Sequence, residues 1–195
     1  MDNTSASGGY LVPAPGLSRR QIEDLLNSLI AALTGIPGSL VRPRWQPDPP
    51  EIPERHVNWC AFGIMRREMP NFPQVEHDGE GDGTSRVLTH ETLHCLASFY
   101  GPDAEDKALA LRSGLHVGQN REPLYHEGMA FVEAGELSYL PELGQHSMRW
   151  KPRCDLPLVF RRGPAPQGKG QAAEGEIAVL NIKEVPSCTG NCIQE

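Results

Sequence analysis

Apolar residues recur at three- and four-residue spacing near the start of the chain, which is the period of one face of an α-helix. The stripe consists of Ile22, Leu25, Leu26, Leu29, Ile30 and Leu33. Ser18 precedes it and is a favoured N-cap residue, because its hydroxyl can accept a hydrogen bond from a free backbone N–H of the first turn. Gly35 follows it, and Pro37 prevents the helix from continuing. The pattern predicts an amphipathic helix between Ser18 and Gly35.

The pattern then changes to extended structure. Prolines interrupt residues 36–55 repeatedly, which excludes a helix or a central strand and predicts an extended segment. Residues 57–66 are rich in apolar and aromatic side chains and predict a strand. The glycine- and aspartate-rich residues 77–84 predict a loop. The long segment Arg86 to Tyr100 predicts the partner of the first strand.

The second half of the chain repeats this order of helix and strands. Pro102 can occupy the first turn of a helix that runs to Leu115. The apolar face of that helix consists of Ala104, Ala108, Leu111 and Leu115. A short helix is predicted at 121–127, followed by strands at 129–139 and 148–162.

Together these elements predict an α+β fold, with a small mixed or antiparallel sheet of about four strands and helices packed on one face. The Gly/Ser/Pro-rich residues 1–17 predict a flexible N-terminal arm, and residues 18–162 the folded domain. The pattern is lost after Gly163, so residues 163–195 are expected to form a linker and a C-terminal arm.

Charge restricts the classes of partner. The chain has a net charge of −7 and a pI near 5.5, whereas proteins that bind duplex DNA usually carry a basic face. An acidic surface could still line a channel for DNA, since it would repel phosphate. The sequence has no apolar run of the roughly 18 residues that a membrane span needs, and its N-terminus does not resemble a signal peptide. We therefore expect a protein that is made and kept in a cytoplasm, without membrane contact.

One short motif suggests an enzyme. His90, Glu91 and His94 match H-E-x-x-H, in which two histidines one helical turn apart bind zinc and the glutamate activates a water molecule. The surrounding residues alternate as in a strand, where residues four apart are separated by roughly 13 Å. No third histidine follows in the spacing of the extended motif. A zinc-dependent hydrolase remains the alternative function. The sequence has no other catalytic or cofactor signature, so no catalytic residue and no cofactor are expected.

The chain has five cysteines, and their settings differ. Cys60, Cys95 and Cys154 lie in apolar, strand-like segments, where cysteine usually serves as a small buried residue. Cys188 and Cys192 lie near the C-terminus. We expect these two thiols to form candidate cross-links between subunits once the protein has left the reducing cytoplasm.

Several stretches resemble the phage neck or tail-terminator proteins encoded by many prophages. The most specific are Arg42-Pro-Arg-Trp-Gln-Pro47 and Asn58-Trp-Cys-Ala-Phe-Gly63. Further matches in the same order are Ser7-Gly-Gly-Tyr-Leu-Val-Pro13, Leu33-Thr-Gly-Ile-Pro-Gly38, Ser98-Phe-Tyr-Gly-Pro102, Gly128-Met-Ala-Phe-Val132 and Leu140-Pro-Glu-Leu143. The resemblance covers most of residues 7–162, whereas the segment after Gly163 departs from the family pattern.

The resemblance implies a structural virion protein without catalytic residues. Such a subunit typically assembles as a homo-hexameric ring on the last ring of the tail tube, where it ends tube growth and joins the tail to the head-completion or connector proteins. The sheath is a further candidate partner, and DNA would pass through the lumen without specific binding.

Trp45 is a candidate inter-subunit contact in such a ring. Pro43 and Pro47 flank it, so the aromatic side chain would lose little entropy on docking. The alternative is that Trp45 covers the core of its own subunit.

Overall fold

The computed structural model describes residues 17–78, 84–143 and 150–163. These residues belong to two compact units, one formed by residues 73–88 and the other by the remaining described residues. Apart from Leu17 and Gly163, the predicted arms at 1–17 and 163–195 lie outside the described residues.

Helix α1 spans Arg19–Thr34, as the apolar stripe predicted. The Ser18 hydroxyl accepts a hydrogen bond from the Gln21 N–H, and the Gln21 side chain accepts one from the Ser18 N–H. This reciprocal pair satisfies two of the donors that a helix N-terminus leaves free. Gly35 ends the helix with a φ of 69°, a left-handed conformation that favours glycine.

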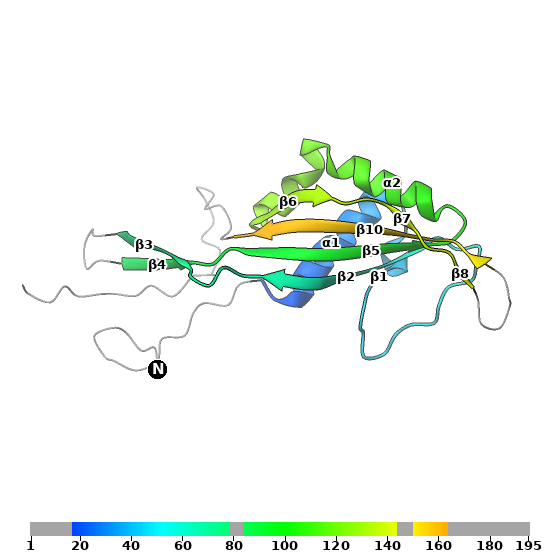
Figure 1. Ribbon diagram of the computed structural model, residues 1–195, viewed down its shortest axis with the longest axis horizontal. Helices are drawn as coiled ribbons and strands as arrows, with labels where there is room; N and C mark the ends of the chain where they lie inside the picture. The colour runs from blue at the N-terminus through cyan, green and yellow to red at the C-terminus, as the bar shows by residue number, and fades with distance from the viewer. Residues whose placement is uncertain (1–16, 79–83, 144–149, 164–195) are drawn as a thin grey trace, which may run out of the picture. The chain divides into compact units, whose positions relative to one another are not determined.

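Six strands form the main sheet, in the order β1-β2-β5-β10-β6, with β7 also paired to β10 (Figure 1). The strands are β1 (Val41–Pro43), β2 (Trp59–Glu68), β5 (Glu91–Tyr100), β6 (Met129–Ala134), β7 (Ser138–Tyr139) and β10 (Arg153–Arg162). Strand β1 is parallel to β2 and the other pairs are antiparallel, so the sheet is mixed.

The sheet is larger than the four strands predicted. Residues 41–43, predicted as part of an extended segment, form an edge strand, where a proline such as Pro43 is tolerated because one side of the strand needs no donor. The strand predicted at 129–139 is divided into β6 and β7, and the intervening Gly135 donates its N–H to the Pro157 carbonyl.

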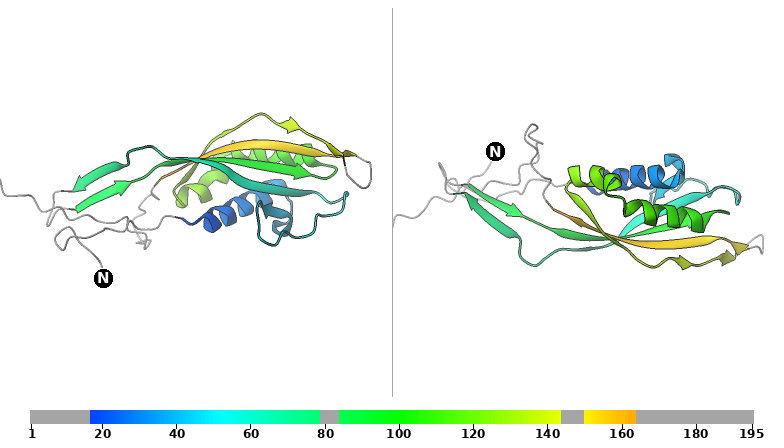
Figure 2. Two further views of the ribbon diagram at one scale, coloured as in Figure 1. Left: turned by 60° about the horizontal axis from the view of Figure 1, so that its bottom comes forward. Right: turned by 90° about the horizontal axis from the view of Figure 1, so that it is seen from above.

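Alternating residues of β5 face the helices. Leu93, Cys95, Ala97 and Phe99 are buried. Their partners on β10 are all buried, as are Phe62 and Cys60, the β2 partners of Ala97 and Phe99. Helices α1 and α2 (Ala104–Leu115) pack on this side (Figure 2). The four predicted face residues of α2 are all buried. The helices thus cover one face of the sheet, as predicted.

Residues 73–88 form a separate hairpin of β3 (Gln74–Asp78) and β4 (Thr84–Leu88), with Val75 opposite Val87. The prediction of one continuous strand at 86–100 was therefore wrong. Of the loop predicted at 77–84, residues 77, 78 and 84 belong to the two strands, and 79–83 lie outside the described residues. Thr89 and His90 interrupt the second strand, so that β4 pairs with β3 and only β5 joins the main sheet. Alternation alone did not reveal this break, because short strands on either side of it show the same period.

The remaining elements are short. The predicted helical piece consists of η2 (Gly118–Arg121) and α3 (Glu122–His126), and η1 (Gly38–Leu40) precedes β1. Strands β8 (Glu142–Leu143) and β9 (Trp150–Lys151) pair with each other. Among the described helices, none has the length and apolarity that crossing a membrane requires.

Replacing Phe99 with Ala is expected to lower the free energy of unfolding by about 3–5 kcal/mol, because Phe99 is fully buried in the core and the change leaves a cavity. Leu109 on α2 is 42% exposed, and the matched change Leu109→Ala should have an effect of less than about 1 kcal/mol. Urea unfolding followed by circular dichroism measures both. Similar losses in the two variants would contradict the assignment of the core.

Candidate assembly surface

The chain leaves the edge of the sheet at Trp45 in a strained conformation. The Arg44 N–H donates to the Phe62 carbonyl at 2.7 Å, which extends the pairing one residue beyond β1. Trp45 then has a φ of 60° and is the only non-glycine residue with positive φ among those described. Such a conformation costs of order 1–3 kcal/mol and persists only where the surroundings enforce it.

The Trp45 ring lies against β2, with most of its surface exposed. A β-carbon added at Gly63 would lie 2.9 Å from ring atom Cζ3, so the ring packs closely only because residue 63 is glycine. The Arg19 guanidinium stands 5.7 Å from the ring centroid, within the range of a cation–π contact. The side chain is 61% exposed and contributes little to the core of its own subunit. Its role as an inter-subunit anchor remains a prediction.

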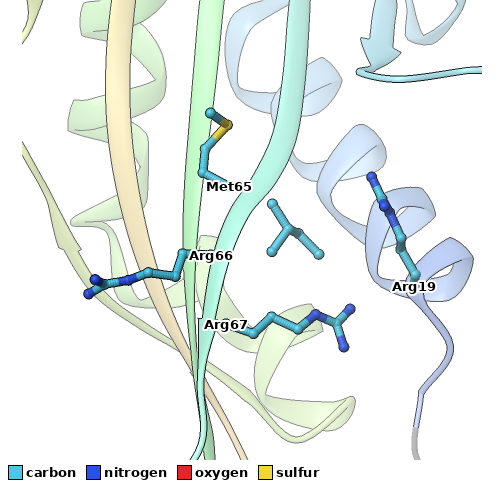
Figure 3. A pocket seen from close by; sticks show the side chains of 5 residues that line it. Arg19, Met65, Arg66 and Arg67 are labelled. Carbon is cyan, nitrogen blue, oxygen red and sulfur yellow. The ribbon is translucent and has the colours of Figure 1, made fainter.

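A pocket of about 420 Å³ lies beside Arg19. It is lined by Arg19, Ile64, Met65, Arg66 and Arg67, and we call it the basic groove. Arg67 extends from β2 toward α1, which carries Arg19, whereas Arg66 leaves the other side of the strand (Figure 3). The groove is therefore lined by two apolar residues, Ile64 and Met65, and three arginines, of which Arg19 and Arg67 lie on the same side of β2 (Figure 3).

A buried carboxylate, that of Glu91, lies near Arg67 of the basic groove. Glu91 is 7% exposed and accepts a hydrogen bond from Arg162 Nη1 at 2.6 Å. Its other oxygen, Oε2, has no hydrogen-bond partner, and Arg67 Nη1 is 3.7 Å away. Arg67 therefore interacts electrostatically with Glu91 but donates no hydrogen bond to it. The donors of its guanidinium group remain available to a carboxylate that enters the groove from outside.

The zinc motif does not have the geometry that its chemistry requires. His94 and Glu91 lie on β5, and an odd spacing along a strand places their side chains on opposite faces of the sheet. Glu91 faces the helices and is held by Arg162, whereas His94 lies on the other face, with Nε2 3.4 Å from Glu68 Oε1. His90 precedes the strand. No group of three potential metal ligands occurs in the described parts of the chain.

The sheet face opposite the helices, which we call the open face, carries a layer of paired aromatic and charged side chains. Trp59 and Tyr100 are cross-strand neighbours whose rings stack at 4.2 Å. Arg42 stands over Trp59 and Arg153 over Tyr100, at 5.8 and 5.7 Å from the ring centroids. Sequence reasoning missed this layer. Alternation shows which residues of one strand share a face, but the register that makes Trp59 and Tyr100 neighbours depends on tertiary pairing.

An ion pair extends the layer into β10. Arg153 donates two hydrogen bonds to Asp155, both 2.8 Å long, and a third to Glu142. The Ser98 hydroxyl donates to Asp155 and accepts from Arg44. Burial raises the pKa of Asp155, but the hydrogen bonds from Arg153 and Ser98 outweigh it, and the pKa lies below its usual value.

The three strand cysteines are buried free thiols, as predicted. Burial raises the pKa of Cys95 to about 12 and also raises that of Cys60. These thiols are protonated at neutral pH and are unsuited to act as nucleophiles. The predicted cross-linking pair, Cys188 and Cys192, lies outside the described residues.

The family is decided by a comparison with family models. A model described as phage neck terminator protein matches residues 20–190. The chain belongs to this family. No match was found among curated proteins.

The range matched by the phage neck terminator family agrees with the resemblance seen in the sequence and extends it toward the C-terminus. It reaches residue 190 and includes most of the segment after Gly163, so the expectation that this segment departs from the family was wrong. The arginine-lined groove, Trp45 and the open face all lie within the matched range. They belong to a structural protein of the virion neck, which interacts with other phage proteins.

The Asp155 ion pair makes the stability of this neck terminator depend on pH. Because the folded-state pKa is depressed, the pair stabilises the fold fully above the unfolded-state pKa of about 3.9, and this contribution is lost as pH falls through the folded-state pKa. Asp155→Asn should lower the free energy of unfolding at pH 7 by about 1–3 kcal/mol. It should also flatten the decline in stability between about pH 5 and pH 2.

Urea unfolding at several pH values measures the effect. Asp106→Asn, at an exposed position in the first turn of α2, is the matched control. A decline as steep in Asp155→Asn as in the wild type would contradict this assignment.

Proposed function

We propose that this protein is a tail terminator that forms a homo-hexameric ring on the last ring of the tail tube. The ring ends tube growth and presents a surface to the head-completion or connector proteins, with the sheath as a further candidate contact. The family match, which covers most of the chain, is the observation that carries this proposal.

Features of the surface support an assembly role. Trp45, Phe72 and Trp150 are more than 60% exposed, although large apolar side chains are more stable when covered by a partner. The net charge of −7 suits a lumen through which DNA slides without specific binding, because like charges repel.

The parts of the chain outside the core have assigned roles in this proposal. Residues 18–162 form the ring domain, and the arms at 1–17 and 163–195 reach neighbouring subunits. Trp45 contacts the next subunit, and Cys188 and Cys192 cross-link subunits in the mature particle. Non-reducing gels of mature particles should then contain covalent oligomers. Glu91 and His94 lie on opposite faces of β5 and His90 precedes the strand, so this geometry gives no support to the alternative of a zinc-dependent hydrolase.

Deleting the protein from a phage that encodes it should yield tails of uncontrolled length and heads that are not joined to tails. Without a terminator, nothing stops the addition of tube rings. Electron microscopy of the lysates measures tail length and attachment, and supplying the wild-type protein from a plasmid should restore both. Normal, attached tails in the deletion strain would contradict the proposed function.

Trp45→Ala should weaken ring assembly at least about tenfold, because an exposed aromatic at an interface centre often contributes more than 1.4 kcal/mol. Tyr125→Ala is the matched control, since Tyr125 and Trp45 are both 61% exposed. Size-exclusion chromatography with light scattering over a concentration series measures assembly. If Trp45→Ala assembles as the wild type does, Trp45 is not an anchor.

A further inference from the structure

The segment between β1 and β2 is acidic and rich in prolines, and it carries one large apolar side chain, Ile52. Residues 46–54, which we call the acidic loop, read Gln-Pro-Asp-Pro-Pro-Glu-Ile-Pro-Glu. They contain three carboxylates, four prolines and no lysine or arginine. Because proline fixes φ, such a loop loses little conformational entropy when it binds.

The apolar and acidic side chains of the acidic loop are exposed to solvent. Ile52 is 72% exposed, and its neighbours Glu51 and Glu54 are also exposed. The loop is nevertheless held in place, because Arg42 Nη1 donates to the Glu51 carbonyl at 2.6 Å and the following Arg55 donates to the Trp150 carbonyl at 2.9 Å. An apolar side chain between two carboxylates on a fixed support is a preorganised docking element.

The basic groove is complementary to the acidic loop in apolarity and in charge. Ile64 pairs with Cys95 and Arg67 with Leu93, so both face the same side of β2, and Ile64 offers an apolar contact beside the arginines. Arg19 and Arg67 can pair with carboxylates (Figure 3). Arg19 already pairs with Glu23 at 2.7 Å, whereas the nearest carboxylate to Arg67 is 3.7 Å away, so Arg67 has the greater capacity for a new partner.

The groove and the Ile52 end of the loop lie at different ends of β2 within one subunit. Arg42, which holds Glu51, is the partner of Ala61 across the β1–β2 pair. Arg67 follows Ala61 by six residues, roughly 20 Å along an extended strand. Ile52 therefore does not fill the groove of its own subunit, as its exposure also indicates.

We propose that the acidic loop of one copy of this chain docks in the basic groove of the next copy, with Ile52 on Ile64, and Glu51 and Glu54 beside Arg19 and Arg67. Two different surfaces meet in this contact, so it repeats head to tail and generates a ring when the rotation closes. The inference rests on the proposed ring and names the contact that builds it.

Reversing the charge of the loop is the first test. Glu51→Lys combined with Glu54→Lys should raise the apparent Kd of assembly at least about tenfold, because like charges would then face each other across the interface. Both side chains are exposed, so folding should be preserved, which circular dichroism checks. Glu122→Lys combined with Glu127→Lys, at exposed positions around α3, is the control with the same change in net charge.

The second test asks whether the contact joins two copies. Arg19→Glu combined with Arg67→Glu should also prevent rings, and all four substitutions in one chain should restore them. In a mixture of the loop variant and the groove variant, the substituted loop of one matches the substituted groove of the other, and the unchanged loop matches the unchanged groove. Neither variant should form rings alone, but the mixture should form rings in which the two alternate, measured by light scattering alone and with purified tail tubes.

The outcomes separate this inference from the proposed function. If the wild type forms rings and the loop variant forms them equally well, the inference is wrong and the ring proposal stands. If only the groove variant fails, or the four-fold variant is not rescued, the groove takes another occupant and the inference is again wrong. If the wild type stays monomeric under both conditions, the ring proposal itself fails.

Discussion

The pairing of β5 with β2 on one side and β10 on the other determines both faces of the sheet. Because side chains alternate along a strand, this register buries Leu93, Cys95, Ala97 and Phe99 under the helices and directs the intervening residues to the open face. A shift of one residue would exchange the two faces. The core, the aromatic layer and the basic groove all depend on this one register.

The same register explains why a motif that suggests chemistry instead has a structural role. Glu91, on the core face at the end of β5, neutralises Arg162 and orients Arg67. His94 faces the other way. The residues that a metalloprotease would bring together on one helical face are thus separated by the sheet itself.

Much of the fold could be predicted from the sequence, because the signals were local. The stripe and caps of α1 and the four-residue face of α2 required no knowledge of distant residues. The break at Thr89 and His90, the edge strand at 41–43 and the stack of Trp59 on Tyr100 could not be predicted, since each depends on which strands become neighbours. The site was predicted only at Trp45. Nothing local to Arg19 or Arg67 indicates that α1 and β2 bring them to one groove.

A terminator subunit must be stable alone and still present surfaces that only neighbours cover. In this chain the left-handed Trp45 and the stiff acidic loop follow the edge strand β1, and Arg67 on β2 makes no hydrogen bond to Glu91, its neighbouring carboxylate. Native mass spectrometry of the purified protein tests the central claim directly, because it reports subunit number and bound metal together. We predict a metal-free hexamer, and a monomer that carries one stoichiometric zinc ion would contradict the account.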